Sequence, residues 1–232
     1  MHATVRSAVC RFIFPLFVSL ATAIPAPAAE FPCVGTTVDI EGGDERDRRA
    51  ACDAVREGMA FLETVGISLG EQIRLILVSR APATSSENAI GSYDPRRGEI
   101  TMLEYAAALD GSQRCATPFG HPFSLTLWRS YVVHEVAHAA AHRQFAHRVP
   151  HMLASEYIAS VAQMATLTPH QRERLFTVYP ELSGFEHAAE ISFGYYLLDP
   201  GRFTVNAYLH YMRPENGREF IARLLREGLP QE

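Results

Sequence analysis

The chain has 232 residues, a length that suits one domain with a sizeable hydrophobic core. Its 21 basic residues are all arginines, since the sequence contains no lysine, and 26 acidic residues leave a formal net charge of −5. No basic stripe interrupts this acidic balance, so nucleic acid is excluded as an expected partner. No repeat or low-complexity linker divides the sequence, which predicts a single domain over residues 29–232.

The first 28 residues have the pattern of a secretory signal peptide. Arg6 and Arg11 precede an apolar run over residues 12–20, and Ala26-Pro27-Ala28 places small residues where a signal peptidase cuts. The run is far shorter than the roughly 20 residues of a membrane-spanning helix, and no later segment is long and apolar enough to span. We therefore expect a periplasmic or secreted protein with no membrane span after signal removal.

Three cysteines follow the predicted signal: Cys33, Cys52 and Cys115. An oxidising compartment favours disulfides, and an odd number leaves one thiol unpaired. The sequence does not choose the pair. A bond between Cys33 and Cys52 would tie the start of the exported chain to the first predicted helix.

The N-terminal half combines predicted strands with one helix. A strand is predicted over residues 36–40, and one apolar stripe predicts a helix over 45–65 that ends near Gly66. Residues 73–78 predict a buried strand. The segment 94–98 has a proline early and a glycine late, so it predicts a turn that joins residues 91–93 to 99–103 as a hairpin.

The motif HEVAH at residues 134–138 is the strongest chemical signal in the chain. Two histidines four apart on a helix present their imidazoles to one side, about one turn apart, which is the geometry a zinc ion needs. Glu135 lies where a carboxylate can take a proton from zinc-activated water, as in zinc peptidases. Ser124 is predicted to cap a helix that runs to Phe145, so the motif lies mid-helix.

A catalytic zinc site usually holds three protein ligands and leaves one position for water. A metzincin would have Gly at 141 and His at 144, whereas this chain has Ala141 and Gln144. Pro150 is expected to start a new helix on which Glu156 lies in an otherwise apolar segment. An acidic side chain there needs a partner, and zinc would supply it.

With Glu156 on the second helix, the chain resembles the thermolysin-like zinc peptidases, the gluzincins, over about residues 125–167. The resemblance implies that Glu135 is the general base and that zinc has three ligands: His134, His138 and Glu156. It also implies that an edge strand above the first helix binds extended peptide, for which residues 100–103 are the candidate. The alternative is an ordinary sheet edge that binds nothing.

The resemblance departs from the family at two positions. Ser155 and Ser160 stand where the thermolysin group often has Asn and Asp. A serine accepts a hydrogen bond but supplies no charge, so the contacts that orient the histidines are either weaker or come from elsewhere.

Three other residues compete as ligands. His142 lies one turn beyond His138, but three successive side chains at this spacing cannot easily converge on one tetrahedral ion. His151 is a weaker alternative. Cys115 could offer a thiolate, but the residues around it lack the deformylase-type pattern.

After residue 167 the pattern predicts helices near 172–178, 186–198, 203–212 and 218–225. The fold class is therefore α+β: a small zincin-like domain with an N-terminal mixed sheet and a helix, then the HExxH helix and a helical C-terminal half. A family enzyme also needs a donor for the developing oxyanion. The candidates are Tyr195, Tyr196, Tyr208, His210 and Tyr211, and no motif chooses among them.

We interpret the chain as an exported zinc-dependent metallohydrolase, a peptidase that acts on a peptide or protein substrate with Zn²⁺ as cofactor. The alternative is a non-catalytic zinc-binding module that serves as a scaffold or binding protein. Glu135 favours catalysis, because a structural zinc site has no use for a base beside its ligand. The uncharged serines favour the alternative.

Overall fold

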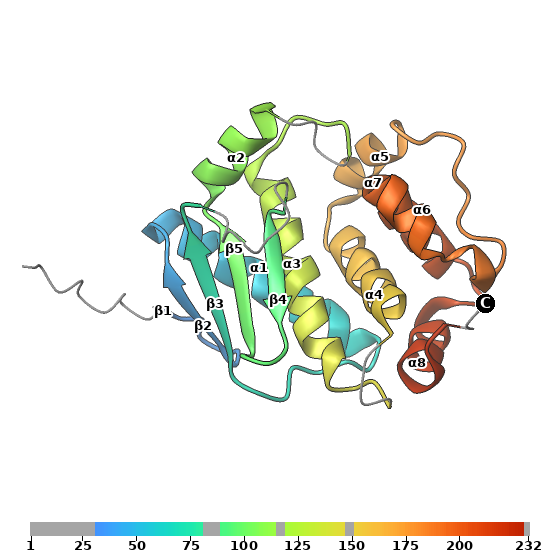
Figure 1. Cartoon of the computed structure of the whole chain (residues 1–232), viewed down its shortest axis with the longest axis horizontal. Helices are drawn as coiled ribbons and strands as arrows, with labels where there is room; N and C mark the ends of the chain where they lie inside the picture. Colours follow the sequence, from blue (N-terminus) through green and yellow to red (C-terminus); the bar gives the residue numbers. More distant parts are fainter. Residues whose placement is uncertain (1–30, 81–88, 115–118, 147–150, 230–232) are drawn as a thin grey trace, which may run out of the picture.

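The computed structural model describes residues 31–80, 89–114, 119–146 and 151–229, which form a mixed five-stranded sheet and eight α-helices. Figure 1 shows the sheet on one side of the molecule and the later helices on the other, with α3 (Leu125–His142) and α4 (Met152–Ala165) side by side between them. The predicted α+β class is confirmed. The predicted signal peptide, Cys115 and Pro150 lie outside the described residues.

The sheet has the strand order β1-β2-β3-β5-β4. Three central strands run parallel: β2 (Val38–Gly42), β3 (Ile73–Val78) and β5 (Glu99–Leu103). The edge strands, β1 (Phe31–Pro32) and β4 (Gly91–Asp94), are antiparallel to their neighbours. The predicted hairpin and the strand over 73–78 are confirmed, and β2 begins two residues later than expected.

The prediction that residues 100–103 form an edge strand is wrong. β5 pairs with β3 on one side and with β4 on the other. The tight turn at residues 95–98 folds β4 back along the outside of β5, so the earlier strand of the hairpin takes the edge position. The strand beside the HExxH helix with an open side is therefore β4.

One face of the sheet is apolar and the other is polar, because side chains alternate along each strand. The buried face carries Ile40, Leu75, Ile100 and their neighbours in the core. The opposite face carries Arg74, which pairs with Glu41 at 2.8 Å and with Glu99 at 3.2 Å. Among the described residues, the helices therefore pack on the apolar face.

Helix α1 (Glu45–Thr64) packs beside the HExxH helix; α1 contacts β2, and the HExxH helix contacts β4 and β5. The Asp44 side chain caps it by accepting a hydrogen bond from the Asp47 backbone at 2.8 Å. Gly58 lets α3 approach closely, because a Cβ at that position would lie 3.2 Å from Val133 Cγ1. A disulfide between Cys33 and Cys52 fastens the β1–β2 loop to α1, so the disulfide expected from the cysteine count is present and its partners are now assigned.

The remaining helices all follow the sheet in the sequence. They are α2 (Tyr105–Arg114), α3 (Leu125–His142), α4 (Met152–Ala165), α5 (Pro169–Phe176), α6 (Phe193–Leu198), α7 (Pro200–Tyr211) and α8 (Gly217–Glu227). The pattern did not predict α2, whose short alanine-rich sequence has little periodicity. The predicted helix over 186–198 is largely wrong: the segment holds a 3₁₀ turn (Ala188–Glu190), then Ser192 caps the short α6.

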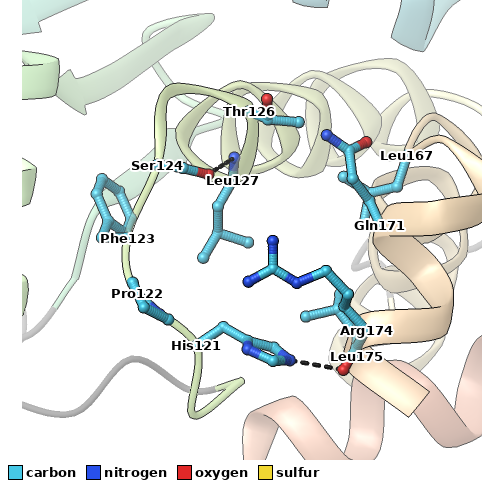
Figure 2. A pocket seen from close by; sticks show the side chains of 10 residues that line it. All are labelled: His121, Pro122, Phe123, Ser124, Thr126, Leu127, Leu167, Gln171, Arg174 and Leu175. Atoms are coloured by element: carbon cyan, nitrogen blue, oxygen red, sulfur yellow. Dashed lines mark hydrogen bonds between the residues drawn. The ribbon is translucent and has the colours of Figure 1, made fainter. Parts of the chain in front are cut away.

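Two further features of the described residues bear on function. None of the helices there is long and apolar enough to cross a membrane. A pocket of about 200 Å³ opens between the N-terminal end of α3 and α5 (Figure 2).

Replacing Cys33 and Cys52 together by alanine removes a cross-link that spans 19 positions of sequence. We expect the free energy of unfolding to fall by about 3 kcal/mol, because the unfolded chain regains the freedom that the loop closure removes. Urea denaturation of the variant and the wild type measures the difference. Three free thiols in the denatured, unreduced protein beginning near Ala29 would contradict the bond.

Candidate metal centre

Helix α3 carries the HExxH motif at its centre. The Ser124 side chain accepts a hydrogen bond from the Leu127 backbone at 3.2 Å, so the predicted cap is confirmed. The helix ends at His142, three residues before the predicted end. Trp128 and Val136 are fully buried, and Trp128 Nε1 donates to the Leu103 carbonyl of β5 at 2.8 Å, which fixes α3 against the sheet.

Helix α4 packs closely against α3. Both helices bury alanines, Ala141 on α3 and Ala154 and Ala162 on α4, whose small side chains let the two backbones approach. The packing brings Glu156, on the second turn of α4, opposite the two histidines of the motif. The three predicted ligands thus come together from two helices.

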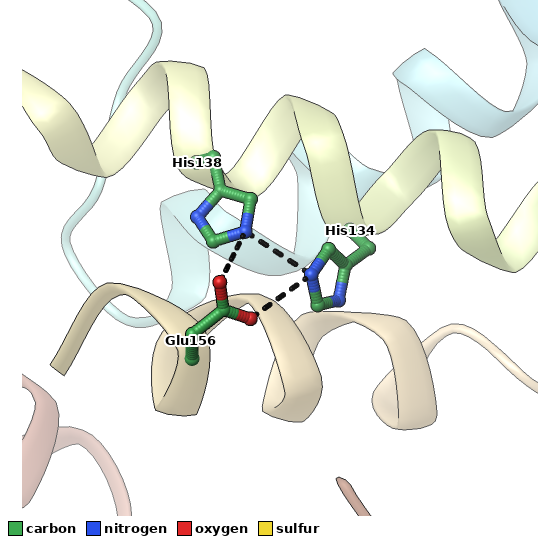
Figure 3. Close-up of side chains that lie close together, drawn as sticks. All are labelled: His134, His138 and Glu156. Carbon is green, nitrogen blue, oxygen red and sulfur yellow. Dashed lines mark hydrogen bonds and ion pairs between the residues drawn. The ribbon is translucent and has the colours of Figure 1, made fainter. Parts of the chain in front are cut away.

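The ligand atoms of this group face one another across the helix pair (Figure 3). His134 Nε2 and His138 Nε2 are 3.1 Å apart. The Glu156 carboxylate lies beside both, with Oε2 at 3.4 Å from His134 Nε2 and Oε1 at 3.6 Å from His138 Nε2. The atoms that each residue could offer to a metal ion all lie within 4.8 Å of one another.

A buried hydrogen-bond chain orients His134. Gln163 Nε2 donates to Ser130 Oγ at 3.2 Å, and Ser130 Oγ donates to the Leu127 carbonyl at 2.7 Å. Gln163 therefore presents its oxygen to His134 Nδ1, at 3.1 Å, and that nitrogen must carry the proton. In a neutral imidazole, Nε2 is then left with its lone pair directed at the other ligands.

The two serines that depart from the gluzincin pattern have different roles. Ser155 Oγ contacts His138 Nδ1 at 2.8 Å and so orients the second histidine. Ser160 is fully buried and bonds Thr204 Oγ1 at 3.2 Å, away from both histidines.

Gln163 was missed in the sequence, although a signal exists. It lies seven positions after Glu156, two helical turns along the same face of α4, and it is polar in an apolar stretch. Its exposed fraction of 1% means that its amide needs partners inside the protein.

Burial and mutual charge set the protonation of the ligands. Burial alone would raise the pKa of Glu156, but its interactions with the two histidines outweigh that effect and lower the pKa to about 2. Burial lowers the pKa of His138 to about 4. Burial also opposes protonation of His134, but the neighbouring carboxylate of Glu156 outweighs the effect of burial and raises the pKa of His134. Glu156 Oε2 is buried without a hydrogen-bond partner among the described residues.

Glu135 is buried beside this group, and burial raises its pKa to about 7 against the opposing charge of His134. The carboxylate side chain packs against the edge strand. A Cβ on Gly91 of β4 would lie 2.9 Å from Glu135 Cγ and 2.3 Å from Met102 Sδ. The absence of a side chain at position 91 makes room for the predicted base.

Tyr196 is the one predicted oxyanion donor that the structure places at this group. Its hydroxyl lies close enough to the Glu156 carboxylate to lower the pKa of that carboxyl, and burial together with the nearby charges of Glu156 and Glu135 raises the pKa of Tyr196. It comes from α6, so three helices contribute side chains to the centre.

The other four donor candidates are engaged elsewhere. Tyr195 accepts hydrogen bonds from Arg202 at 3.2 Å and Asn206 at 3.4 Å. His210 Nδ1 bonds the Tyr157 hydroxyl at 2.7 Å. The remaining two pack against aromatic rings: Tyr208 on Phe176 and Tyr211 on Phe61.

The competing ligands stay apart from the group. His142 packs edge-on against the Tyr93 ring of β4, with the ring centres 5.8 Å apart. His151 occupies the N-cap position of α4. Neither belongs to the cluster of His134, His138 and Glu156.

Comparison with known proteins identifies the family. A model of a family of unknown function, DUF6639, matches residues 38–229. The chain belongs to that family. No curated protein and no solved structure gives a significant match. The matched range contains every strand and helix described above except β1, and all the residues of the centre.

Gly91→Ala should destabilise the protein by about 1–3 kcal/mol, because the added methyl group overlaps Met102 and the Glu135 side chain. Gly111→Ala on α2 is the matched control: nothing lies near its added methyl group, and alanine favours a helix by up to about 1 kcal/mol. Denaturant unfolding of both variants measures the difference. Equal stabilities for the two would show that β4 does not pack on Glu135.

Proposed function

We propose that this protein is an exported zinc-dependent metallohydrolase, most simply a peptidase of the gluzincin type. The observation that carries the proposal is the convergence of His134, His138 and Glu156 beside the buried carboxylate of Glu135. A set of two imidazoles and one carboxylate suits zinc, and three protein ligands leave a coordination position for water.

The donor set fits a cation on chemical grounds. The Nε2 atoms of His134 and His138 lie 3.1 Å apart; without a metal ion one of the two must carry a proton, whereas a divalent cation would accept both lone pairs. The Glu156 carboxylate adds negative charge at the same point, and its Oε2 lacks a hydrogen bond from the described residues. A divalent cation held by these atoms would satisfy all three side chains at once.

Zinc, when bound, supplies a Lewis acid that polarises a carbonyl and lowers the pKa of a water molecule. The chain supplies the base. Glu135 is buried, and its pKa of about 7 suits a group that accepts and releases a proton near neutral pH. It would take the proton from the attacking water and pass it to the leaving amine.

Tyr196 would stabilise the negative charge that develops on the substrate oxygen. Its hydroxyl lies near the ligand carboxylate, and burial, with the charges of Glu156 and Glu135, raises its pKa and keeps it protonated as a donor. A neutral donor fixed in a water-poor site stabilises an oxyanion without having to reorganise during the reaction.

A peptide is the favoured substrate class because of β4. This strand packs against α3 beside Glu135, and its outer side has no neighbour among the described strands. An extended peptide can pair with such an edge through backbone hydrogen bonds. Export is supported by the signal-like N-terminus and by the disulfide between Cys33 and Cys52, which an oxidising compartment favours.

The alternative is a zinc-binding scaffold without catalysis. It is favoured by the uncharged partners of the histidines, Ser155 and Gln163, which raise ligand basicity less than carboxylates do. Glu135 distinguishes the two functions, because a scaffold does not need its carboxylate.

Substitution at the two glutamates should separate metal binding from catalysis. Glu156→Gln should lose most bound zinc, since a neutral amide oxygen is a much poorer ligand than a carboxylate. Glu135→Gln should keep one zinc per chain and lose at least roughly a hundredfold in turnover, since the amide cannot accept a proton. Elemental analysis of the purified proteins and the rate on a peptide that the wild type cleaves are the two measurements.

His134→Ala and His142→Ala form a matched pair of controls on the same helix. The first should lose zinc, whereas the second should keep it, because His142 lies outside the ligand cluster. Full activity in Glu135→Gln would refute the catalytic mechanism. If the wild type holds zinc but cleaves nothing across a broad peptide library, the scaffold function takes its place.

Tyr196→Phe should retain zinc and lower kcat by roughly 10²–10³-fold with little change in KM, since the lost donor acts on charge that forms only in the transition state. Tyr195→Phe is the matched control, because that hydroxyl faces Arg202 and Asn206 instead. Steady-state kinetics on both variants tests the assignment, and equal kcat values would assign the oxyanion donor elsewhere.

A further inference from the structure

A pocket lies between the N-terminal end of α3 and α5, and its lining includes none of the candidate metal ligands. Its walls are largely apolar and come from Pro122, Phe123, Leu127, Leu167 and Leu175. The volume of about 200 Å³ is below the roughly 300–1,000 Å³ of sites for drug-sized ligands, so the pocket suits a group about as large as one aromatic side chain.

One cationic group reaches into this apolar space. Figure 2 shows the Arg174 guanidinium directed across the pocket toward Leu127. Among the described residues, this guanidinium has no ion pair and no hydrogen bond. The backbone of Arg174 is fixed separately, because its carbonyl accepts a hydrogen bond from His121 Nε2 at 2.6 Å.

The neighbouring arginine of the same helix shows the contrast. The Arg172 guanidinium donates to the carbonyls of Ala165 at 3.2 Å and Met164 at 3.4 Å, and it lies over the Tyr208 ring. Arg172 therefore closes the end of α4 and has a structural role. The Arg174 guanidinium has no such contact within the described part of the chain, so it can meet a ligand.

Another polar side chain at the pocket, that of Gln171, complements a negative charge. Among the described residues that line the pocket, none is acidic. Gln171 uses its side-chain oxygen to accept from the Thr168 backbone at 2.8 Å as part of a capping box, which leaves its amide NH₂ as a donor at the pocket wall. A planar guanidinium binds a carboxylate through two parallel hydrogen bonds.

We propose that this pocket binds a carboxylate attached to an apolar group, with Arg174 holding the carboxylate and Phe123, Leu127 and Leu175 enclosing the apolar part. Two sources share this chemistry: the C-terminal residue of a peptide, and a small free aryl or alkyl acid. The site is built from residues outside the metal centre, so it stands whether or not the chain binds zinc or cleaves peptides.

The test is an NMR titration of the ¹⁵N-labelled protein with two probes. N-acetylphenylalanine represents a peptide C-terminus and 3-phenylpropionate represents a free acid. Saturable binding with a Kd of roughly 1 mM or tighter is expected for at least one probe, with amide shifts at Phe123 and Leu127. The tighter probe identifies the source of the ligand.

Three comparisons decide the role of Arg174. Arg174→Gln should weaken the tighter probe at least about tenfold, as expected for losing a charged hydrogen-bond partner. Arg49→Gln, an exposed arginine on α1, should leave the Kd unchanged. N-acetylphenylalaninamide lacks the carboxylate. Its affinity for the wild type should be no higher than the affinity of N-acetylphenylalanine for Arg174→Gln.

The proposal is overturned if neither acid binds saturably, if Arg174→Gln binds the tighter acid as well as the wild type does, or if the amide binds as tightly as the acid. Arg174 is exposed, so its variant should fold. An unchanged melting temperature and amide spectrum away from α5 verify this.

Discussion

The constraint on which the rest of the structure depends is the burial of three electron-pair donors that face one another between α3 and α4. Burying a carboxylate and two imidazoles costs free energy unless each has a partner. The protein supplies partners on the outer side of each histidine, through Gln163 and Ser155. The inner nitrogens face Glu156 in a group that could hold a metal ion.

The remainder of the fold holds this arrangement in place. The disulfide anchors the N-terminal loop to α1, and the glycine at position 58 lets α3 settle on α1. Buried alanines bring α4 close enough for Glu156 to meet the histidines. Gly91 lets the edge strand pack on Glu135. The short helix α6 brings Tyr196 close to Glu156. Small residues therefore occur where backbones must approach, and polar ones where the donors must be oriented.

Sequence reasoning found the parts of this centre that depend on local spacing. Two histidines four apart, the adjacent Glu135, and Glu156 in an apolar helix are local signals, and so were the hairpin and most helices. It could not find Gln163 as the partner of His134, because that contact depends on how two helices pack. Sequence reasoning also misplaced the edge strand, since hairpin spacing does not say which strand lies outside. It predicted one helix over 186–198 because the apolar residues there follow a helical spacing, although several of them are exposed.

The most direct test of the central claim is zinc K-edge X-ray absorption on the purified, zinc-loaded protein. The account predicts one tightly bound zinc per chain with only nitrogen and oxygen neighbours at about 2.0–2.2 Å, as two imidazoles, a carboxylate and water require. A sulfur neighbour at about 2.3 Å would assign the metal to a cysteine, and a protein that binds no zinc would contradict the metal centre outright.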